Sequence, residues 1–139
     1  MIKELVTDEA ILSQPCEPAT AEDAELAQDL LDTLASIEDG ACLAANQIGV
    51  AKAMFAYVDD KQKAHVVLNP RIMLGLAPAR VVEGCLTREE ETSVKRFAKV
   101  KLQYDEIVDD RLVSRRSDFV GWMAQVVQHM VDHCHGKLI

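Results

Sequence analysis

The sequence has few aromatic residues, fewer basic than acidic side chains and no long apolar run. Aromatic side chains make up 4% of the chain against 49% hydrophobic residues overall, so its core must be mainly aliphatic. The formal net charge of −8 argues against nucleic acid and against anionic membranes as partners, because both are bound through basic surfaces. No apolar run approaches the roughly 18 residues that span a bilayer, and no signal-peptide pattern opens the chain. We therefore expect a cytoplasmic protein.

The sequence also lacks paired cysteines and any feature that would divide it into domains. Its four cysteines, Cys16, Cys42, Cys85 and Cys134, lie far apart and form no Cys-x-x-Cys pair. In a reducing compartment such cysteines are free thiols or metal ligands. No internal repeat, low-complexity tract or Pro/Gly-rich linker is present, so we predict one domain over residues 1–139.

The first half of the chain predicts a helix followed by short strands. Thr20 and Asp23 have the spacing of a helix start, leucines then recur at helical spacing, and Gly40 follows as a stop. This predicts a helix over about residues 21–37. Short apolar or alternating runs predict strands at 54–58, 65–68, 80–82, 98–104 and 112–115.

The end of the chain predicts a second helix, from Asp118 to about His135. Its apolar stripe comprises Phe119, Met123, Val126, Val127 and Met130, and Gly136 is the expected stop. His135 should be a solvated residue at the helix end. A helix, several strands and a second helix together predict an α+β fold.

His129 and His133 lie four residues apart on this predicted helix, so they project from one face. An arbitrary pair of this kind is more often part of a helix surface, and a metal site needs a third ligand. Cys85 is the candidate, because Gly84 lets the backbone turn tightly beside it; the alternative is a buried free thiol at a strand end. One thiolate and two imidazoles leave a fourth position open for water, which is typical of catalytic sites that hold one divalent ion, Zn²⁺ or Fe²⁺.

Three segments resemble, in order, the three motifs of the peptide deformylase family. Gly40-Ala41-Cys42-Leu43-Ala44-Ala45-Asn46-Gln47 resembles Gly-x-Gly-Leu-Ala-Ala-x-Gln, Glu83-Gly84-Cys85-Leu86-Thr87 resembles Glu-Gly-Cys-Leu-Ser, and Gln128-His129-Met130-Val131-Asp132-His133 resembles Gln-His-Glu-x-Asp-His. The opening Asp8-Glu9-Ala10-Ile11-Leu12 also resembles the family's N-terminal stretch. The resemblance therefore runs nearly end to end.

The resemblance implies a deformylase-like fold with an N-terminal helix, short and mostly antiparallel strands and a C-terminal metal-binding helix. It implies a reaction that removes the formyl group from the N-terminal formyl-methionine of new proteins, with water activated by iron or zinc. By position, the metal ligands would be Cys85, His129 and His133. The developing oxyanion would be held by the Gln47 side chain and the Leu86 backbone N–H. The substrate-binding residues would be Gly40, Cys42, Leu43, Glu83 and Gly84, with Glu83 supporting the Cys85 loop through a basic partner.

Met130 occupies the position where the family has its general acid/base glutamate. A thioether carries no proton, and the loss of positioned acid–base help typically costs about 10²–10⁴ in rate. Asp132 is better interpreted as a carboxylate that supports a metal ligand from behind or lies on the surface, and Glu83 as a residue with a structural role. The sequence thus leaves three hypotheses: an impaired deformylase, a non-catalytic protein that binds metal and formyl-methionyl peptides, or a structural or vestigial metal site. Met130 itself could simply continue the apolar stripe of the helix.

Two further positions depart from the family. Cys42 replaces the second glycine of the first motif. It could narrow the substrate groove or offer a fourth metal ligand, but a small buried apolar residue is the favoured interpretation. The chain also ends three residues after Gly136, where many family members continue with an extension that can contact the ribosome. No such contact is therefore expected.

Overall fold

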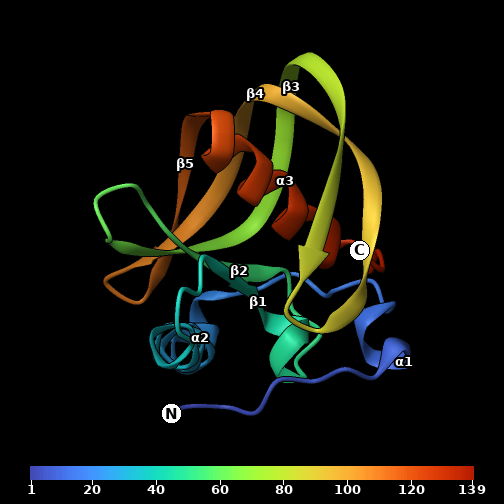
Figure 1. Ribbon diagram of the computed structural model, residues 1–139. Coiled ribbons are helices and arrows are strands. Elements are labelled where there is room, and N and C mark those ends of the chain that lie inside the picture. The colour runs from blue at the N-terminus through green and yellow to red at the C-terminus, as the bar shows by residue number, and fades with distance from the viewer.

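The computed structural model describes the backbone of residues 1–139 and the side chains of all of them except Arg88 and Glu89 (Figure 1). Its elements, in order, are α1 (Glu9–Leu12), η1 (Ala21–Asp23), α2 (Ala24–Ser36), β1 (Cys42–Ala44), η2 (Ala45–Ile48), β2 (Met54–Val58), β3 (Ala64–Cys85), β4 (Arg88–Val108), β5 (Arg111–Val120) and α3 (Gly121–Cys134). The strands form one antiparallel sheet in the order β1-β2-β3-β4-β5. The predicted α+β class is confirmed.

The helix predicted over residues 21–37 is present as the 3₁₀ turn η1 followed by α2. Thr20 and Asp23 form the expected capping box: Asp23 accepts from the Thr20 backbone N–H, and the Thr20 hydroxyl accepts a backbone N–H of the first turn. Leu30 and Leu34 are buried on the inner face of α2. A further single turn, α1, is capped by Asp8.

The short strands predicted at 65–68 and 80–82 are parts of one long strand, β3, and 98–104 lies within the equally long β4. Register shifts interrupt their pairing at three places, and such irregularities bend a strand pair. Figure 1 shows the curved ribbon of β3 and β4 passing around α3. A hairpin of this length therefore wraps the last helix instead of lying flat beneath it.

The last helix begins later than predicted. Asp118 and Phe119 belong to β5, where they pair with Lys101 and Val100, and α3 starts only at Gly121. Phe119 is buried in the core, but from a strand, so its assignment to the helical stripe is wrong. Gly121 has a φ of +60°, which turns the chain from strand into helix. At the other end, exposed His135 and Gly136 follow α3 as expected.

Two apolar clusters, on opposite faces of the first strands, fix the position of α3. Phe55 and Tyr57 of β2 pack with α3, whereas Met54 and Ala56 of the same strand pack with α2. Alternation along a strand sends successive side chains to opposite faces, so β2 is buried on both.

Among the described residues, no helix is both long and apolar enough to cross a membrane.

Candidate metal centre

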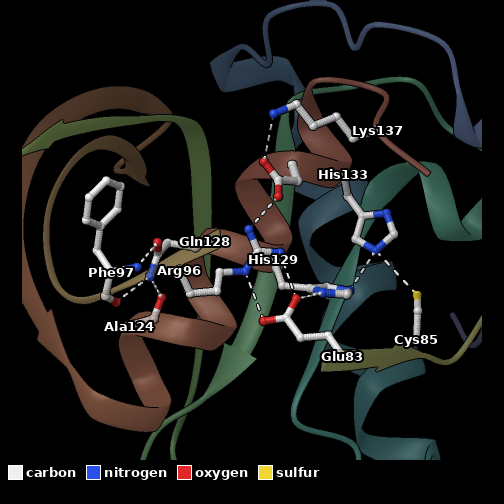
Figure 2. Close-up of polar contacts among 10 residues, drawn as sticks. Glu83, Cys85, Arg96, Phe97, Ala124, Gln128, His129, His133 and Lys137 are labelled. Atoms are coloured by element: carbon white, nitrogen blue, oxygen red, sulfur yellow. Dashed lines mark hydrogen bonds and ion pairs between the residues drawn. The ribbon is translucent and has the colours of Figure 1, made fainter. Parts of the chain in front are cut away.

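Cys85, His129 and His133 come together in the structure as the sequence predicts. Their ligand atoms lie within 4.8 Å of one another. The Nε2 atoms of the two histidines are 3.1 Å apart, and the Cys85 Sγ lies 3.4 Å from the His133 Nε2 (Figure 2). Within the described part of the chain, this is the one group of three or more such side chains that could hold a metal ion.

The local structure explains why these three side chains meet. His129 and His133 follow each other by one turn on the inner face of α3, and both are buried. Cys85 is the last residue of β3, directly after a register shift that begins at Glu83. The shift ends the regular pairing and turns the thiol towards the helix.

The donor set fits a divalent transition metal. Ligands about 2.0–2.3 Å from a tetrahedral ion lie about 3.3–3.7 Å from one another, close to the distances that His133 makes to His129 and Cys85. Two imidazole nitrogens that face each other at 3.1 Å share at most one proton, whereas a metal ion satisfies both lone pairs and the sulfur. A thiolate with two imidazoles suits zinc and iron(II).

Glu83 fixes the orientation of the first histidine. Its Oε1 lies 2.9 Å from the His129 Nδ1, so that nitrogen donates to the carboxylate and Nε2 faces the metal position, where a metal ion would replace the second proton of the imidazole. Burial would raise the pKa of Glu83, but the hydrogen bonds from His129 and Arg96 outweigh it and lower the value to about 2. Glu83 is therefore a permanent carboxylate that aims an imidazole at the metal position.

Arg96 is the basic partner that the sequence implied but did not identify. It donates to both oxygens of Glu83, at 2.9 and 2.7 Å, and to the Asp132 Oδ2 at 2.6 Å (Figure 2). Lys137 adds an ion pair to Asp132 at 3.4 Å. A weak signal was present: Arg96 has the same strand parity as the buried Val100, Leu102 and Tyr104, although Ala98 between them is exposed. The network joins the Cys85 loop to α3.

We expect Cys85 of the metal-free protein to be a thiolate at neutral pH. Burial opposes its ionisation, but hydrogen bonds with His129 and His133 outweigh it and lower the pKa of Cys85 to about 5. Burial raises the pKa of the other three thiols, Cys16, Cys42 and Cys134. Thiolate absorbance in the far ultraviolet should therefore fall as the pH drops through about 5, and Cys85→Ser should lack this step. A step only near the ordinary pKa of cysteine would contradict this arrangement.

Metal binding must compete with a proton on the first histidine. Burial lowers the pKa of His129, but its bonds with Cys85 and Glu83 outweigh burial and raise the value to about 9. A metal ion that takes the place of this proton keeps the thiolate paired with positive charge. Proton release on metal addition is the expected accompaniment at neutral pH.

Gln47 points its amide N–H groups at the third ligand. Its Oε1 accepts from the Ala44 backbone N–H at 2.9 Å, which fixes the direction of the amide. Its Nε2 then donates to the Cys85 Sγ at 3.3 Å and to the Thr87 hydroxyl at 3.2 Å. The neighbouring Asn46 donates to the His133 carbonyl at 2.9 Å, so η2 is tied to α3. A rigid hydrogen-bond donor thus lies next to the candidate metal position.

A cleft of about 390 Å³ opens beside the cluster. Of the predicted substrate- and oxyanion-binding residues, Gly40, Cys42, Gln47, Glu83, Gly84 and Leu86 line it, together with Cys85, His129 and Met130. Leu43 does not: it is fully buried against α2, because alternation along β1 turns it away from the cleft. Trp122 and Gln125, which the sequence did not single out, complete the wall on the side of α3.

Cys42 lies in this cleft but outside the metal cluster. It is partly buried and packs against the core that contains α3. Burial, followed by the charges of Cys85 and Glu83, raises its pKa to about 12. Among the described residues, its thiol is not part of the group of three converging ligand atoms.

Met130 is 1% exposed and belongs to the apolar core, with part of its surface on the cleft. The two carboxylates nearest to the cluster in sequence are both engaged. Glu83 bonds His129 and Arg96, and Asp132 bonds Arg96 and Lys137. Neither is placed as an uncommitted acid or base beside the cluster.

Comparisons with known proteins agree with the motifs. The sequence model of a family described as polypeptide deformylase matches residues 2–139. The peptide deformylase of Clostridium beijerinckii is 34% identical over 140 residues, covering all of both chains, and that of Mesorhizobium japonicum is 36% identical over 96% of this chain and 79% of the relative. The crystal structure of peptide deformylase from Thermus thermophilus matches with a TM-score of 0.84 and 28% identity, over 99% of this chain and 83% of that one. The Met-Ala-Ser-bound class I type b enzyme of Acinetobacter baumannii matches with a TM-score of 0.82 and 25% identity, over 99% and 96%. The chain therefore has the deformylase-like fold and belongs to the polypeptide deformylase family.

Proposed function

We propose that this protein is a metal-dependent hydrolase of the deformylase type, which binds N-terminal formyl-methionyl peptides and removes the formyl group slowly. The observation that carries the proposal is the convergence of Cys85, His129 and His133 beside a cleft that Cys85 and His129 line. The slow rate follows from Met130, which stands where the family has its general acid/base glutamate. Such a protein keeps the electrostatic part of catalysis and lacks the proton shuttle.

The proposed division of labour follows from the geometry. Cys85, His129 and His133 would hold one divalent ion, zinc or iron(II), which when bound lowers the pKa of water and polarises the formyl oxygen. Gln47, held by the Ala44 N–H, would donate its amide hydrogen to the developing oxyanion, with the Leu86 backbone N–H as the second donor. The bond from the Ala44 N–H fixes the direction of the Gln47 amide before substrate arrives, and the bond to Cys85 or to Thr87 would give way to the oxyanion.

The substrate would lie in the cleft between two backbone segments. Gly40 and Cys42 line one part of it, and Glu83 and Gly84 another. A Cβ added at Gly84 would meet no atom within 4 Å, so the backbone there is open to a peptide. The Acinetobacter relative, solved with Met-Ala-Ser bound, supports a methionyl peptide as the ligand of this family's cleft.

A second candidate is a non-catalytic protein that binds metal and N-terminal formyl-methionyl peptides. It is favoured by one observation: Met130 cannot accept a proton, and both Glu83 and Asp132 are committed to Arg96. Binding requires the metal and the cleft, whereas turnover requires in addition a group that moves protons.

The test is deformylation of formyl-Met-Ala-Ser by the iron- or cobalt-loaded protein, with release of the free amine as the readout. We expect measurable, metal-dependent turnover about 10²–10⁴ below that of an ordinary family member. The controls are the protein after a chelator has removed its metal and the variant Cys85→Ser, and neither should release free amine. Turnover at an ordinary family rate would overturn the assigned defect and require another base. Binding of Met-Ala-Ser without any turnover would select the non-catalytic candidate.

A further inference from the structure

Among the described residues, two buried polar side-chain atoms lack a hydrogen-bond partner, and the two are complementary. They are the Asn46 Oδ1, which can only accept a hydrogen bond, and the His133 Nδ1, which can donate one. Asn46 is fully buried and His133 is 1% exposed, so both side chains lie inside the protein. Buried polar groups of native proteins are nearly always paired, so these two atoms require an explanation.

Asn46 and His133 are already joined through another pair of atoms. The Asn46 Nδ2 donates to the His133 backbone carbonyl at 2.9 Å. Because a carbonyl oxygen can only accept, this bond fixes which end of the amide is the nitrogen. It leaves Oδ1 as an unpaired acceptor on the same planar group. The two unpaired atoms therefore belong to one pair of residues in contact, where η2 lies against α3.

The two nitrogens of the His133 imidazole have different roles. Its Nε2 lies 3.1 Å from the His129 Nε2 and 3.4 Å from the Cys85 Sγ, so this nitrogen would bind the metal ion. A neutral imidazole that binds a metal through one nitrogen carries its proton on the other. The His133 Nδ1 is then a donor, and the unpaired Asn46 Oδ1 is the matching acceptor.

We propose that Asn46 is the positioning residue of His133: its Oδ1 accepts the hydrogen bond from the Nδ1–H of the metal-bound imidazole. This inference rests on the metal site of the proposed function. Asn46 and Gln47 are consecutive residues of η2, and Gln47 donates to the Cys85 Sγ at 3.3 Å. This single turn would therefore support two of the three ligands. Such partners of metal-bound histidines typically contribute about 10–100-fold to metal affinity.

Two variants separate this role from the bond that ties η2 to α3. Asn46→Leu removes both ends of the amide, so zinc affinity, measured by competition with a chelator under folded conditions, should fall by about 10–100-fold. Asn46→Asp keeps an acceptor for the His133 Nδ1–H but loses the donor to the His133 carbonyl. Its zinc affinity should therefore stay close to that of the parent. Equal losses in both variants would show that Asn46 only ties η2 to α3, and would overturn the proposal.

Gln128→Leu is the matched control. Gln128 is also a buried amide of the α3 packing, but it bonds the backbone of Phe97 and Ala124 instead of a ligand. This variant should lose stability and keep its zinc affinity. A loss of zinc affinity as large as that of Asn46→Leu would overturn the specific role of Asn46.

A measurement on the parent protein does not depend on the folding of any variant. In the zinc-loaded protein with isotope-labelled histidine, nuclear magnetic resonance should find the His133 proton on Nδ1, at the downfield position of a hydrogen-bonded imidazole N–H. An unprotonated Nδ1, or an N–H resonance that Asn46→Leu leaves unmoved, would overturn the inference and leave the proposed function standing. A parent protein that binds no zinc would overturn the proposed function and this inference with it.

Discussion

Met130→Glu is expected to raise the rate of formyl-peptide hydrolysis by about 10²–10⁴, because it restores a positioned acid/base beside the metal. Met130 follows His129 directly on α3, and part of its side chain lies on the cleft. A carboxylate at this position could take a proton from water at the metal and pass it to the leaving amine. The measurement is kcat/KM for formyl-Met-Ala-Ser with the same metal in both proteins.

The matched control for this gain is Met130→Gln. Glutamine has nearly the same shape and can hydrogen-bond to water, but it transfers no proton at neutral pH. It therefore separates proton transfer from a merely more polar cleft. Equal gains for the glutamate and glutamine variants would show that the acid/base explanation is wrong.

The substitution has a structural cost that the experiment must follow. Met130 is 1% exposed and packs in the core around α3, where an ionised carboxylate is unfavourable without a partner. A bound divalent metal supplies that partner, so Met130→Glu should lose stability mainly in its metal-free form. If the metal-loaded variant is folded and still shows no turnover, Cys42 is the next residue to test as the cause of the missing activity. The variant to measure is then Met130→Glu combined with Cys42→Gly.

The sequence predicted the centre of the site better than its surroundings. His129 and His133 could be placed together because helical spacing alone brings residues i and i+4 to one face. Cys85 could be named as a candidate third ligand, but only the resemblance favoured a ligand over a buried free thiol, since no local pattern states where the end of a strand lies relative to a helix. The partners of Glu83 required the fold, because Arg96 and Asp132 meet only when β4 crosses beside α3.

The errors in the fold have a physical origin too. The residues before Gly121 fit both a helical stripe and an alternating strand, and pairing with β4 decided for the strand. The long strands β3 and β4 were divided into short ones, because a bulged strand interrupts the alternation that identifies it. The position of Trp122 on the cleft could not be predicted, because an exposed side chain near a cleft has no sequence pattern of its own.

Arg96→Leu is expected to destabilise the metal-free protein by about 3–5 kcal/mol, because it leaves buried carboxylates without their cation. Arg96 is 7% exposed and joins the Glu83 carboxylate, buried at 6% exposure, to Asp132. Leucine fills part of the space but donates no hydrogen bond. Asp132 retains Lys137, so the larger part of the loss should come from Glu83. Urea unfolding of the metal-free protein measures this change.

The same variant should weaken zinc binding by about 10–100-fold, since Glu83 orients His129 only while it is itself held in place. Competition with a chelator under folded conditions separates this effect from stability. Arg115→Leu is the matched control: Arg115 also pairs with a glutamate, Glu106, but on the surface, where such pairs contribute about 0–1 kcal/mol. Equal losses of stability in both variants, or zinc binding by Arg96→Leu as tight as that of the parent, would contradict this role. The contacts of Arg96 would then contribute no more than ordinary packing. Loss at Arg96 alone, in both measurements, would mean that the salt bridges hold Glu83, and through it His129, in the geometry that the metal requires.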